Sequence, residues 1–331
     1  MQDQRTFSAK IMLFGEYSIL LGSPAFSIPF DYFSATLRIP VSGEEHLTSR
    51  YKESSKMLRE FYNKSLSQNG VFSGILDLKK LKDELDAGLY LDSTIPSKYG
   101  SGSSGALCAA VYDRYAYEPL CQKDSFGIAD MVKLRKIFIS MESFFHGKSS
   151  GLDPLVIYLR HPLIINEDGL ISLAVIPGDF MKDKGKIFLV DTGQSRGTAT
   201  LVPSFLEQYS LHGDKGRAGK KLCELNHLCI SHLCGHDESG FLENLTLLSD
   251  FQFRNLTPMI PDHMRVFWSE GLDNGLFSLK LCGSGGGGFL TGFTTDFEKT
   301  LDYFRNRNIP VIPVDIDSVS RIILPRAPED V

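Results

Sequence analysis

A short loop of very small residues, followed at once by a helical pattern, constrains this chain more than any other feature. Residues 100–105 read Gly-Ser-Gly-Ser-Ser-Gly, and the residues that follow, ALCAAVY, are typical of a buried helix. Glycines let backbone N–H groups approach a ligand closely, and the first turn of a helix adds unpaired N–H groups and the positive end of its dipole. The segment therefore predicts an anion site, most often a phosphate site.

Two interpretations of this loop stay open from its sequence alone. Ser103 and Ser104 place hydroxyls where a phosphate oxygen or its magnesium ion would lie, as a serine or threonine does in another phosphate-binding fold. The alternative is a Gly/Ser turn that only caps a buried helix, because serine is a good N-cap residue and a glycine loop alone is a weak motif.

Length and composition are those of a globular protein with room for two domains. The chain has 331 residues, of which 42% are hydrophobic and 23% are charged, and this length exceeds one typical domain. A net charge of −5 and the lack of a basic run give no reason to expect a nucleic-acid partner. No apolar stretch approaches the roughly 18 residues of a membrane span, and the N-terminus does not read as a signal peptide. We therefore expect a cytoplasmic protein with no membrane partner.

The cysteines predict neither a disulfide framework nor a zinc site. Six cysteines occur without a CxxC pair, and Cys108 falls among apolar helix positions, where a reduced buried thiol is expected. Residues 227–236, HLCISHLCGH, hold three histidines and two cysteines. A helical pattern would spread these side chains over several faces, whereas a tetrahedral zinc site needs convergent ligands.

The first half of the chain is predicted to begin with strands and to continue with helices. Residues 10–21, KIMLFGEYSILL, look like a buried hairpin bent at Gly15, in which Glu16 must be paired or face a cleft. Residues 76–91 fit either a short helix or a pair of strands. The other expected elements are a strand within residues 25–40 and amphipathic helices at 53–67 and 130–145.

A second stretch of chemical interest is HGKSSGLDPLVIYLRHPLII, residues 146–165. A Lys-Ser-Ser-Gly turn leads to Asp153, and Pro154 is expected to prevent a helix, so residues 155–159 are predicted to form a strand. Asp153 could simply form an Asx-turn. However, Glu142 lies on the last turn of the preceding helix, on the same face as the position four residues later. We therefore expect four side chains to lie together: Glu142, His146, Ser150 and Asp153.

The second half of the chain contains a run of four glycines between apolar segments. Residues 279–293, LKLCGSGGGGFLTGF, predict a tight hairpin whose backbone can touch a ligand or another loop. The polar run KDKGK at residues 182–186 marks the expected boundary between domains 1–184 and 185–331. The other expected elements are a strand at 186–191, helices at 198–209, 219–233 and 238–253, and a closing edge strand at 309–324.

Taken together, the glycine loops and their neighbours stand in an order that resembles a known family. The stretches are KIMLFGEYSILLG, PSKYGSGSSGAL with its later partner ESFFHGKSSGLDP, and KLCGSGGGG. Their order and spacing resemble the GHMP kinases, which include galactokinase, homoserine kinase, mevalonate kinase and phosphomevalonate kinase. The resemblance implies an α+β, two-domain GHMP kinase fold with an N-terminal ribosomal-S5-like domain and a C-terminal ferredoxin-like domain.

Within the superfamily the chain most resembles mevalonate kinase. That group has a lysine six residues before a glutamate in its first motif, and Lys10 and Glu16 keep this spacing. It also has a glutamate four residues before His-Gly, followed by Ser-Gly-x-Asp, and an Arg-x-Thr after a later strand. The matching residues here are Glu142, His146, Ser150, Asp153, Arg196 and Thr198.

The resemblance implies a role for each matched residue, with ATP and Mg²⁺ as cofactors. Asp153 would be the general base toward the substrate hydroxyl, with Lys10 the cation beside it, and Ser104 and Glu142 would hold the magnesium ion. The residues implied to bind the nucleotide phosphates are Lys98, Gly100, Ser101, Gly102, Ser103, Ser104, Gly105, Gly285 and Gly286. The residues implied to contact the acceptor are Glu16, Tyr17, His146, Ser150, Arg196 and Thr198.

The chain also departs from the family pattern at three positions. Tyr17 stands where the first motif usually has histidine, a choice seen also in phosphomevalonate kinases. Lys98 and Tyr99 replace two small residues of the second motif, so either the lip of the phosphate loop has a different shape or Lys98 itself contacts phosphate. A galactokinase is disfavoured, because the first motif lacks the arginine and aspartate that frame its sugar-binding Gly-Glu-His.

The implied function is ATP-dependent phosphorylation of the hydroxyl of a small acid, first of all mevalonate to 5-phosphomevalonate in isoprenoid precursor synthesis. The alternatives are a phosphomevalonate kinase or another GHMP small-molecule kinase, and a GHMP-fold protein that binds nucleotide without turnover. Arg196 and Thr198 could hold a carboxylate and a hydroxyl, although a single arginine is also a common structural ion-pair partner. A homodimer is left open by the resemblance.

Overall fold

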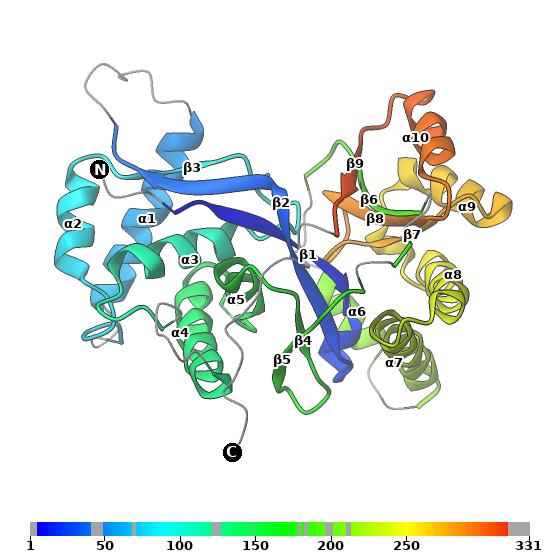
Figure 1. The fold of residues 1–331 in the computed structure, drawn as a ribbon, viewed down its shortest axis with the longest axis horizontal. Helices are drawn as coiled ribbons and strands as arrows, with labels where there is room; N and C mark the ends of the chain where they lie inside the picture. Colours follow the sequence, from blue (N-terminus) through cyan, green and yellow to red (C-terminus); the bar gives the residue numbers. More distant parts are fainter. Residues whose placement is uncertain are drawn as a thin grey trace.

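The protein folds around two antiparallel sheets that lie in different halves of the molecule (Figure 1). The computed structural model describes residues 5–40, 49–67, 71–120, 127–147, 149–177, 180–181, 185–195, 201–209 and 213–316. The first sheet has the strand order β1-β2-β4-β5, with β3 also paired to β2, and the second has the order β7-β8-β6-β9. Within the described residues, no helix is long and apolar enough to cross a bilayer.

The first sheet is built on a long hairpin of the first two strands. In chain order the strands are β1 (Phe7–Phe14), β2 (Ala25–Arg38), β3 (Tyr90–Ser93), β4 (Leu163–Ile165) and β5 (Ile171–Leu173). Nearly every residue of β1 is buried, because α3 (Ser103–Tyr115) and α5 (Leu152–Leu159) pack against it. The other helices of this half are α1 (Ser49–Ser67), α2 (Leu78–Asp86) and α4 (Ile128–His146).

The structure corrects two predicted elements in this half and resolves a third. Residues 155–159 form the end of helix α5 and not a strand, because Pro154 is the third residue of that helix, where a backbone N–H would have no helical partner anyway. Residues 10–21 do not form a hairpin of their own. Strand β1 ends at Phe14, the chain turns through Gly15, and a 3₁₀ helix follows, η1 (Ser18–Leu21). Residues 76–91 contain both a helix, α2, and a strand, β3.

The second sheet contains the predicted glycine hairpin, which joins two neighbouring strands. The strands are β6 (Lys186–Asp191), β7 (Ser278–Leu281), β8 (Phe289–Thr294) and the edge strand β9 (Val311–Val314). The helices are α6 (Leu201–Tyr209), α7 (Gly213–Cys234), α8 (Glu238–Asn255), α9 (Arg265–Asn274) and α10 (Phe297–Arg305), with η3 (Thr257–Met259) and η4 (Asp262–Met264) between α8 and α9. The strand at 186–191 is confirmed. The predicted edge strand at 309–324 is confirmed at β9, and residues 317–324 lie outside the described residues.

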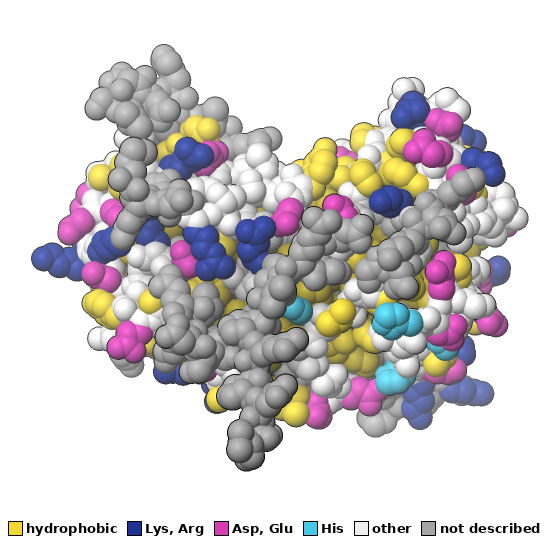
Figure 2. Space-filling view, in the orientation of Figure 1, with side chains coloured by type: hydrophobic (Ala, Val, Ile, Leu, Met, Phe, Trp, Pro, Cys, Tyr) yellow, Lys and Arg dark blue, Asp and Glu magenta, His cyan; other side chains and the backbone are white. Residues whose placement is uncertain are grey.

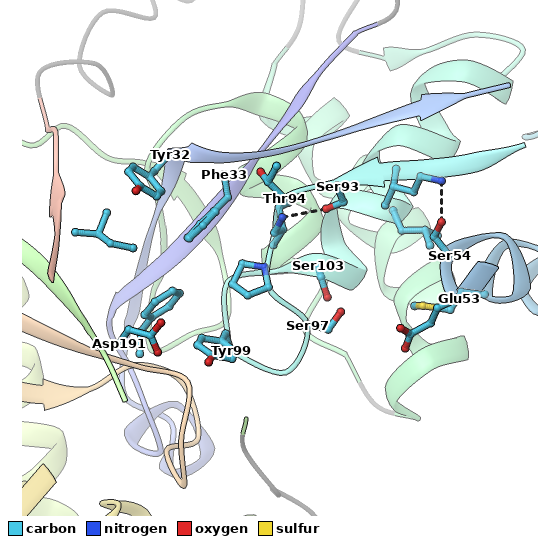
Figure 3. Close-up of a pocket in the computed structure, with 17 residues that line it drawn as sticks. Tyr32, Phe33, Glu53, Ser54, Ser93, Thr94, Ser97, Tyr99, Ser103 and Asp191 are labelled. Atoms are coloured by element: carbon cyan, nitrogen blue, oxygen red, sulfur yellow. Dashed lines mark hydrogen bonds between the residues drawn. The ribbon is translucent and has the colours of Figure 1, made fainter. Parts of the chain in front are cut away.

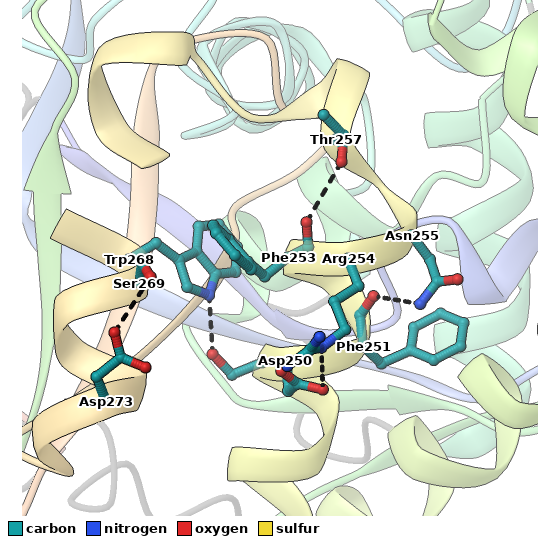
Figure 4. Close-up of polar contacts among 10 residues, drawn as sticks. Asp250, Phe251, Phe253, Arg254, Asn255, Thr257, Trp268, Ser269 and Asp273 are labelled. Carbon is teal, nitrogen blue, oxygen red and sulfur yellow. Dashed lines mark hydrogen bonds and ion pairs between the residues drawn. The ribbon is translucent and has the colours of Figure 1, made fainter. Parts of the chain in front are cut away.

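Helices α8 and α9 pack through a buried tryptophan (Figure 4). The Trp268 ring N–H donates to Ser249 Oγ at 2.9 Å, so the polar atom of this fully buried side chain is satisfied. Arg254 pairs with Asp250 one turn earlier, at 2.7 Å, near the end of α8. The segment between these two helices includes η3, against which the glycine hairpin lies.

Aromatic side chains join the two halves of the molecule into one core. Phe14, the last residue of β1, stacks on Phe293 of β8 with ring centroids 6.0 Å apart. Phe33 of β2 stacks on Phe289 of β8 at 5.9 Å. The chain changes from one sheet to the other between β5 and β6, and we retain 1–184 and 185–331 as a proposed division into domains.

Candidate active site

An ion pair between β1 and α5 lies at the centre of the candidate site. The Lys10 Nζ atom is 2.8 Å from Asp153 Oδ2, and Lys10 is only 4% exposed. The Asp153 side chain is more open, with 27% of its surface exposed. Asp153 is the second residue of α5, whose N-cap is Gly151 in the left-handed region. A buried ammonium group therefore holds a carboxylate that a second molecule can still reach.

The glycine loop lies directly on the lysine of this pair. The backbone N–H of Lys10 donates to the carbonyl of Ser101 at 3.0 Å, and Gly102, with φ of 85°, is the N-cap of α3. A Cβ atom at Gly102 would lie 2.8 Å from Lys10 Cγ and 3.0 Å from Ile157 Cδ1. Glycine is required here by both the backbone conformation and the close approach. The predicted loop-to-helix transition is confirmed.

The N-termini of α3 and α5 meet beside this ion pair. A Cβ atom at Gly105 would lie 2.9 Å from the Pro154 nitrogen and 3.2 Å from Asp153 Cβ, so the two first turns are in contact. Both helices direct the positive ends of their dipoles toward this region. The N–H groups of the first turn of α3 are not used within that helix, whereas in α5 the Leu152 N–H bonds to Ser150 and Pro154 has no N–H. Together with Lys10 the two helix starts make this region favourable for an anion.

A buried carboxylate with two serine hydroxyls adjoins the same loop. Ser104 Oγ donates to Glu142 Oε1 at 3.2 Å, and Ser149 Oγ donates to Glu142 Oε2. Glu142 is 5% exposed, and burial, with the nearby charge of Asp153, raises its pKa to about 7. Carboxylate and hydroxyl oxygens are ligands that Mg²⁺ accepts, with water and phosphate oxygens filling its other positions. The Ser104 and Glu142 side chains therefore fit a magnesium ion carried by a phosphate.

The serine that contacts Glu142 from the turn before α5 is Ser149, and not Ser150 as the sequence predicts. Ser150 was expected beside Glu142, but its hydroxyl accepts the Leu152 N–H at 3.2 Å and so caps the start of α5. Ser149 takes the place beside Glu142 instead. The two serines are adjacent in one turn, and only the path of that turn decides which of them faces the carboxylate.

The raised pKa of Glu142 is expected to make the stability of the nucleotide-free protein depend on pH. Because the pKa of Glu142 is raised to about 7 from an ordinary 4.5, the native state holds this proton more tightly than the unfolded state does. Its contribution to stability is full below pH about 4.5 and is lost as the pH rises through about 7. Glu142→Gln is therefore expected to raise the free energy of unfolding of the nucleotide-free protein by about 1–3 kcal/mol at pH 8, and by little at pH 4.

Thermal unfolding of Glu142→Gln and wild type at pH 4 and pH 8 checks this expectation. The serine hydroxyls can accept as well as donate, so they can still bond to the amide. A melting temperature that the substitution changes equally at both pH values would contradict it.

The first motif reaches the second sheet through Glu16 and Tyr17, both assigned above to the acceptor site. Glu16 is buried and pairs with Lys280 of β7, with Oε1 to Nζ at 2.6 Å. The hydroxyl of Tyr17 donates to the carbonyl of Ser284 at 2.5 Å. Glu16 thus has the partner that a buried carboxylate requires, and the sequence alone did not indicate that this partner is Lys280.

The glycine hairpin contacts Tyr99, the residue directly before the glycine loop of residues 100–105, through its last glycine. A Cβ atom at Gly288 would lie 2.8 Å from Tyr99 Cα, so the two glycine-rich segments are in backbone contact. Gly285 and Gly286 lie against η3, where the N–H of Gly286 donates to the Met259 carbonyl at 2.6 Å. Gly285 and Gly286, which the resemblance assigns to nucleotide binding, therefore lie on the side of the hairpin that contacts η3. Gly288 is the glycine of the hairpin that contacts Tyr99.

Lys98 and Tyr99, which depart from the family pattern, come directly before the glycine loop of residues 100–105. Lys98 is exposed and has a positive φ of 64°. The Tyr99 ring packs edge-on against Phe289 at 5.0 Å between centroids. Burial and the neighbouring carboxylate of Asp191 raise the pKa of Tyr99. Tyr99 therefore attaches the start of the glycine loop to the second sheet.

A cavity of about 630 Å³ opens beside the glycine loop. Figure 3 shows Tyr32, Phe33, Tyr99 and Asp191 toward one end of it and Glu53 toward the other, with Ser97 and Ser103 between them. The outline of the molecule is indented between its two halves in the view of Figure 2. No single segment of the sequence indicates this cavity, because its walls come from β2, α1, β3, the glycine loop and the second sheet.

Three residues predicted for the acceptor site are not placed by the structure. Arg196 and Thr198 lie outside the described residues, and so does the side chain of His146.

No protein-family model and no curated protein sequence matches the chain. Solved structures match over nearly its full length. The mevalonate kinase of L. major in complex with R-mevalonate is 16% identical with a TM-score of 0.61, and the match covers 95% of this chain and 96% of that one. The Streptococcus pneumoniae phosphomevalonate kinase in complex with phosphomevalonate and AMPPNP is 14% identical with a TM-score of 0.61, over 95% and 100%. The Lactococcus lactis galactokinase complexed with galactose is 11% identical with a TM-score of 0.61, over 96% and 94%.

The chain has the GHMP kinase fold. The predicted α+β class is thereby confirmed, and so is the resemblance, at the level of structure. At these identities the comparison establishes the fold, and the chemistry has to be argued from the side chains of this GHMP-fold chain.

Proposed function

We propose that this GHMP-fold protein is an ATP-dependent phosphotransferase that phosphorylates the hydroxyl of a small acid, with mevalonate as the first candidate. The observation that carries the proposal is the Lys10–Asp153 pair in contact with the start of the glycine-loop helix. This arrangement puts a proton acceptor, a cation and an anion-binding helix terminus within one small region. Phosphoryl transfer requires these elements, because it needs positioning and charge stabilisation more than covalent chemistry.

In the proposed reaction Asp153 accepts the proton of the acceptor hydroxyl. The hydroxyl oxygen forms a bond to the γ-phosphorus of ATP, the bond from that phosphorus to the bridging oxygen breaks, and ADP leaves. Lys10 stabilises the negative charge that spreads over the transferred group. For Asp153 to serve as the base, the acceptor hydroxyl must come within about 2.6–3.2 Å of its carboxylate.

The nucleotide phosphates would lie on the loop at the start of α3, which includes Ser101, Gly102 and Ser103. Ser104 and Glu142 would hold Mg²⁺, which when bound neutralises phosphate charge. The cavity beside Ser103 would take the nucleoside, since its aromatic side chains offer apolar walls and its serines offer hydroxyls. Lys98, which is exposed next to the loop, would contact phosphate.

The choice of acceptor is supported by the sequence motifs of the first half of the chain. The spacing of Lys10 and Glu16 and the Ser-Gly-x-Asp that ends at Asp153 favour a mevalonate-like acid. Tyr17 favours the second candidate, phosphomevalonate, because it replaces the usual histidine. The proposal includes a cytoplasmic location and leaves a homodimer open.

One plate assay tests the proposal. The purified protein is given Mg·ATP with mevalonate, phosphomevalonate, homoserine or galactose, and ADP release is followed. We expect acceptor-dependent ADP release with mevalonate or phosphomevalonate. Stoichiometric nucleotide binding with no ADP on any of the four acceptors would contradict the proposal and favour a GHMP-fold protein that binds nucleotide without turnover.

Ser104→Ala should act mainly on the magnesium-loaded nucleotide. Loss of the hydroxyl beside Glu142 removes one oxygen from the proposed magnesium site and leaves the Lys10–Asp153 pair in place. We expect the KM for Mg·ATP to rise by about tenfold, on the scale of one lost hydrogen bond to a charged group. An ATP KM and a kcat that both equal those of wild type would remove Ser104 from the site. Ser140→Ala is a matched control, because the half-buried Ser140 hydroxyl donates to the Lys136 carbonyl of its own helix at 3.1 Å.

A further inference from the structure

A fully buried ion pair connects the turn after β1 to the second sheet. Lys280 Nζ lies 2.6 Å from Glu16 Oε1, and the two side chains are 0% and 1% exposed. The same ammonium group donates to the Leu281 carbonyl at 2.7 Å. Glu16 and Lys280 thus form a specific contact between residues that are far apart in the chain.

Stability alone is a poor explanation for this pair. Removing two charges from water is costly, and an apolar pair of similar volume is often equally stable or more so. The cost is visible at Glu16, since burial raises its pKa although Lys280 lies beside it. A site that could have been filled with apolar side chains instead holds two charges in a fixed geometry.

The pair lies between the two segments that build the candidate active site. Glu16 follows the strand that carries Lys10, and Lys280 precedes the glycine hairpin. The Tyr17–Ser284 hydrogen bond ties the same turn to the same hairpin. At its other end, Gly288 of the hairpin contacts Tyr99, which comes directly before the glycine loop. The position of the hairpin is therefore coupled both to the strand that carries Lys10 and to the glycine loop.

The charges along this path alternate in sign. Asp153 pairs with Lys10, and Glu16 pairs with Lys280. The positive charge of Lys10 also lowers the pKa of Glu16, against the effect of burial. From Asp153, the proposed base, through Lys10 and Glu16 to Lys280 on the second sheet, each charged group therefore has a neighbour of opposite charge.

We propose that Lys280 is a positioning residue that, through Glu16, holds the glycine hairpin and the turn after β1 at the spacing that nucleotide binding and transfer require. This role rests on the proposed function. It also makes Glu16 a member of this pair and not a group that contacts the acceptor.

The test compares single and double variants of the pair. Lys280→Met leaves a buried carboxylate without its partner, so we expect a lower melting temperature. Glu16→Leu/Lys280→Met removes both charges, and we expect its melting temperature to return to within about 3 °C of wild type. A double variant of an exposed pair, Lys221→Ala/Glu224→Ala, is the matched control.

Binding and turnover of the double variant decide between positioning and stability. We expect its affinity for Mg·ATP, measured by calorimetry, to fall at least about fivefold and its kcat at least about tenfold, because both depend on placement. Wild-type affinity and kcat in a double variant that melts like wild type would overturn the positioning role. A wild-type protein that does not bind Mg·ATP would instead overturn the proposed function, and the role that rests on it.

Glu16→Gln keeps the test valid if the double variant does not fold. The amide oxygen can still accept from Lys280, but the negative charge is gone. We expect kcat to fall by about tenfold with an unchanged KM for the acceptor. A similar rise in the acceptor KM at an unchanged kcat would show that Glu16 contacts the acceptor, and would overturn the proposal.

Discussion

Replacing Asp153 with asparagine is expected to lower kcat by at least about 100-fold, because an amide cannot take the proton of the attacking hydroxyl. Asparagine has the shape of aspartate, and its amide oxygen can still accept from Lys10, so the protein should stay folded. Affinity for Mg·ATP should not weaken, since the loop at the start of α3 is untouched. Steady-state kinetics with saturating ATP and calorimetry with Mg·ATP measure the two quantities.

The control for this variant is Asp31→Asn. Asp31 is exposed and pairs with Arg160 at 3.4 Å, on a surface contact of little energetic weight. Its kcat should equal that of wild type. A kcat within about threefold of wild type for Asp153→Asn would remove Asp153 from the mechanism, since a positioned base is worth at least about 100-fold.

Gly105→Ala is expected to damage both stability and turnover. Its Cβ atom would lie 2.9 Å from the Pro154 nitrogen and 3.1 Å from the Asp153 carbonyl carbon. Neither is the end of a flexible side chain, so α3 and α5 must move apart. We expect a loss of about 1–3 kcal/mol in the free energy of unfolding, as for overpacked cores. We also expect kcat to fall by about 100-fold, because displacements of about 1 Å can have that effect.

Gly127→Ala is the matched control for this second variant. Gly127 precedes α4, and nothing lies within 4 Å of the position of its Cβ atom. Its kcat should match that of wild type, and its free energy of unfolding should fall by about 1 kcal/mol at most, because Gly127 is the N-cap of α4, where glycine is favoured over alanine. If Gly105→Ala matched wild type in both stability and kcat, the contact between the starts of α3 and α5 would have no part in placing Asp153.

The sequence was most informative where backbone conformation depends on residue type. The glycines at 100, 102 and 105 predicted a loop followed by a helix, and the structure confirms this because only glycine fits at Gly102 and Gly105. The four consecutive glycines between apolar strands likewise predicted the hairpin that joins β7 and β8. Local chemistry decides these features, so they can be read from the chain.

The sequence was misleading or silent where the outcome depends on distant partners. Pro154 suggested that a helix could not form, but a proline in the first turn is compatible with a helix, and the apolar residues after it pack as α5. The choice of Ser149 over Ser150 beside Glu142 depends on the path of one turn. Lys280, the partner of Glu16, comes from the other sheet, and the cavity beside Ser103 is lined by several elements. No periodicity within one segment indicates such contacts.

Transfer of the terminal phosphate of ATP to an alcohol can be followed with a radioactive label. The protein is incubated with [γ-³²P]ATP, Mg²⁺ and the acceptor that releases most ADP, and the products that carry ³²P are separated. We expect the label to appear in the phosphorylated acceptor, and Asp153→Asn to lower its rate of appearance by at least about 100-fold. Label found only in inorganic phosphate, or in an acceptor product formed as fast by Asp153→Asn, would contradict this expectation.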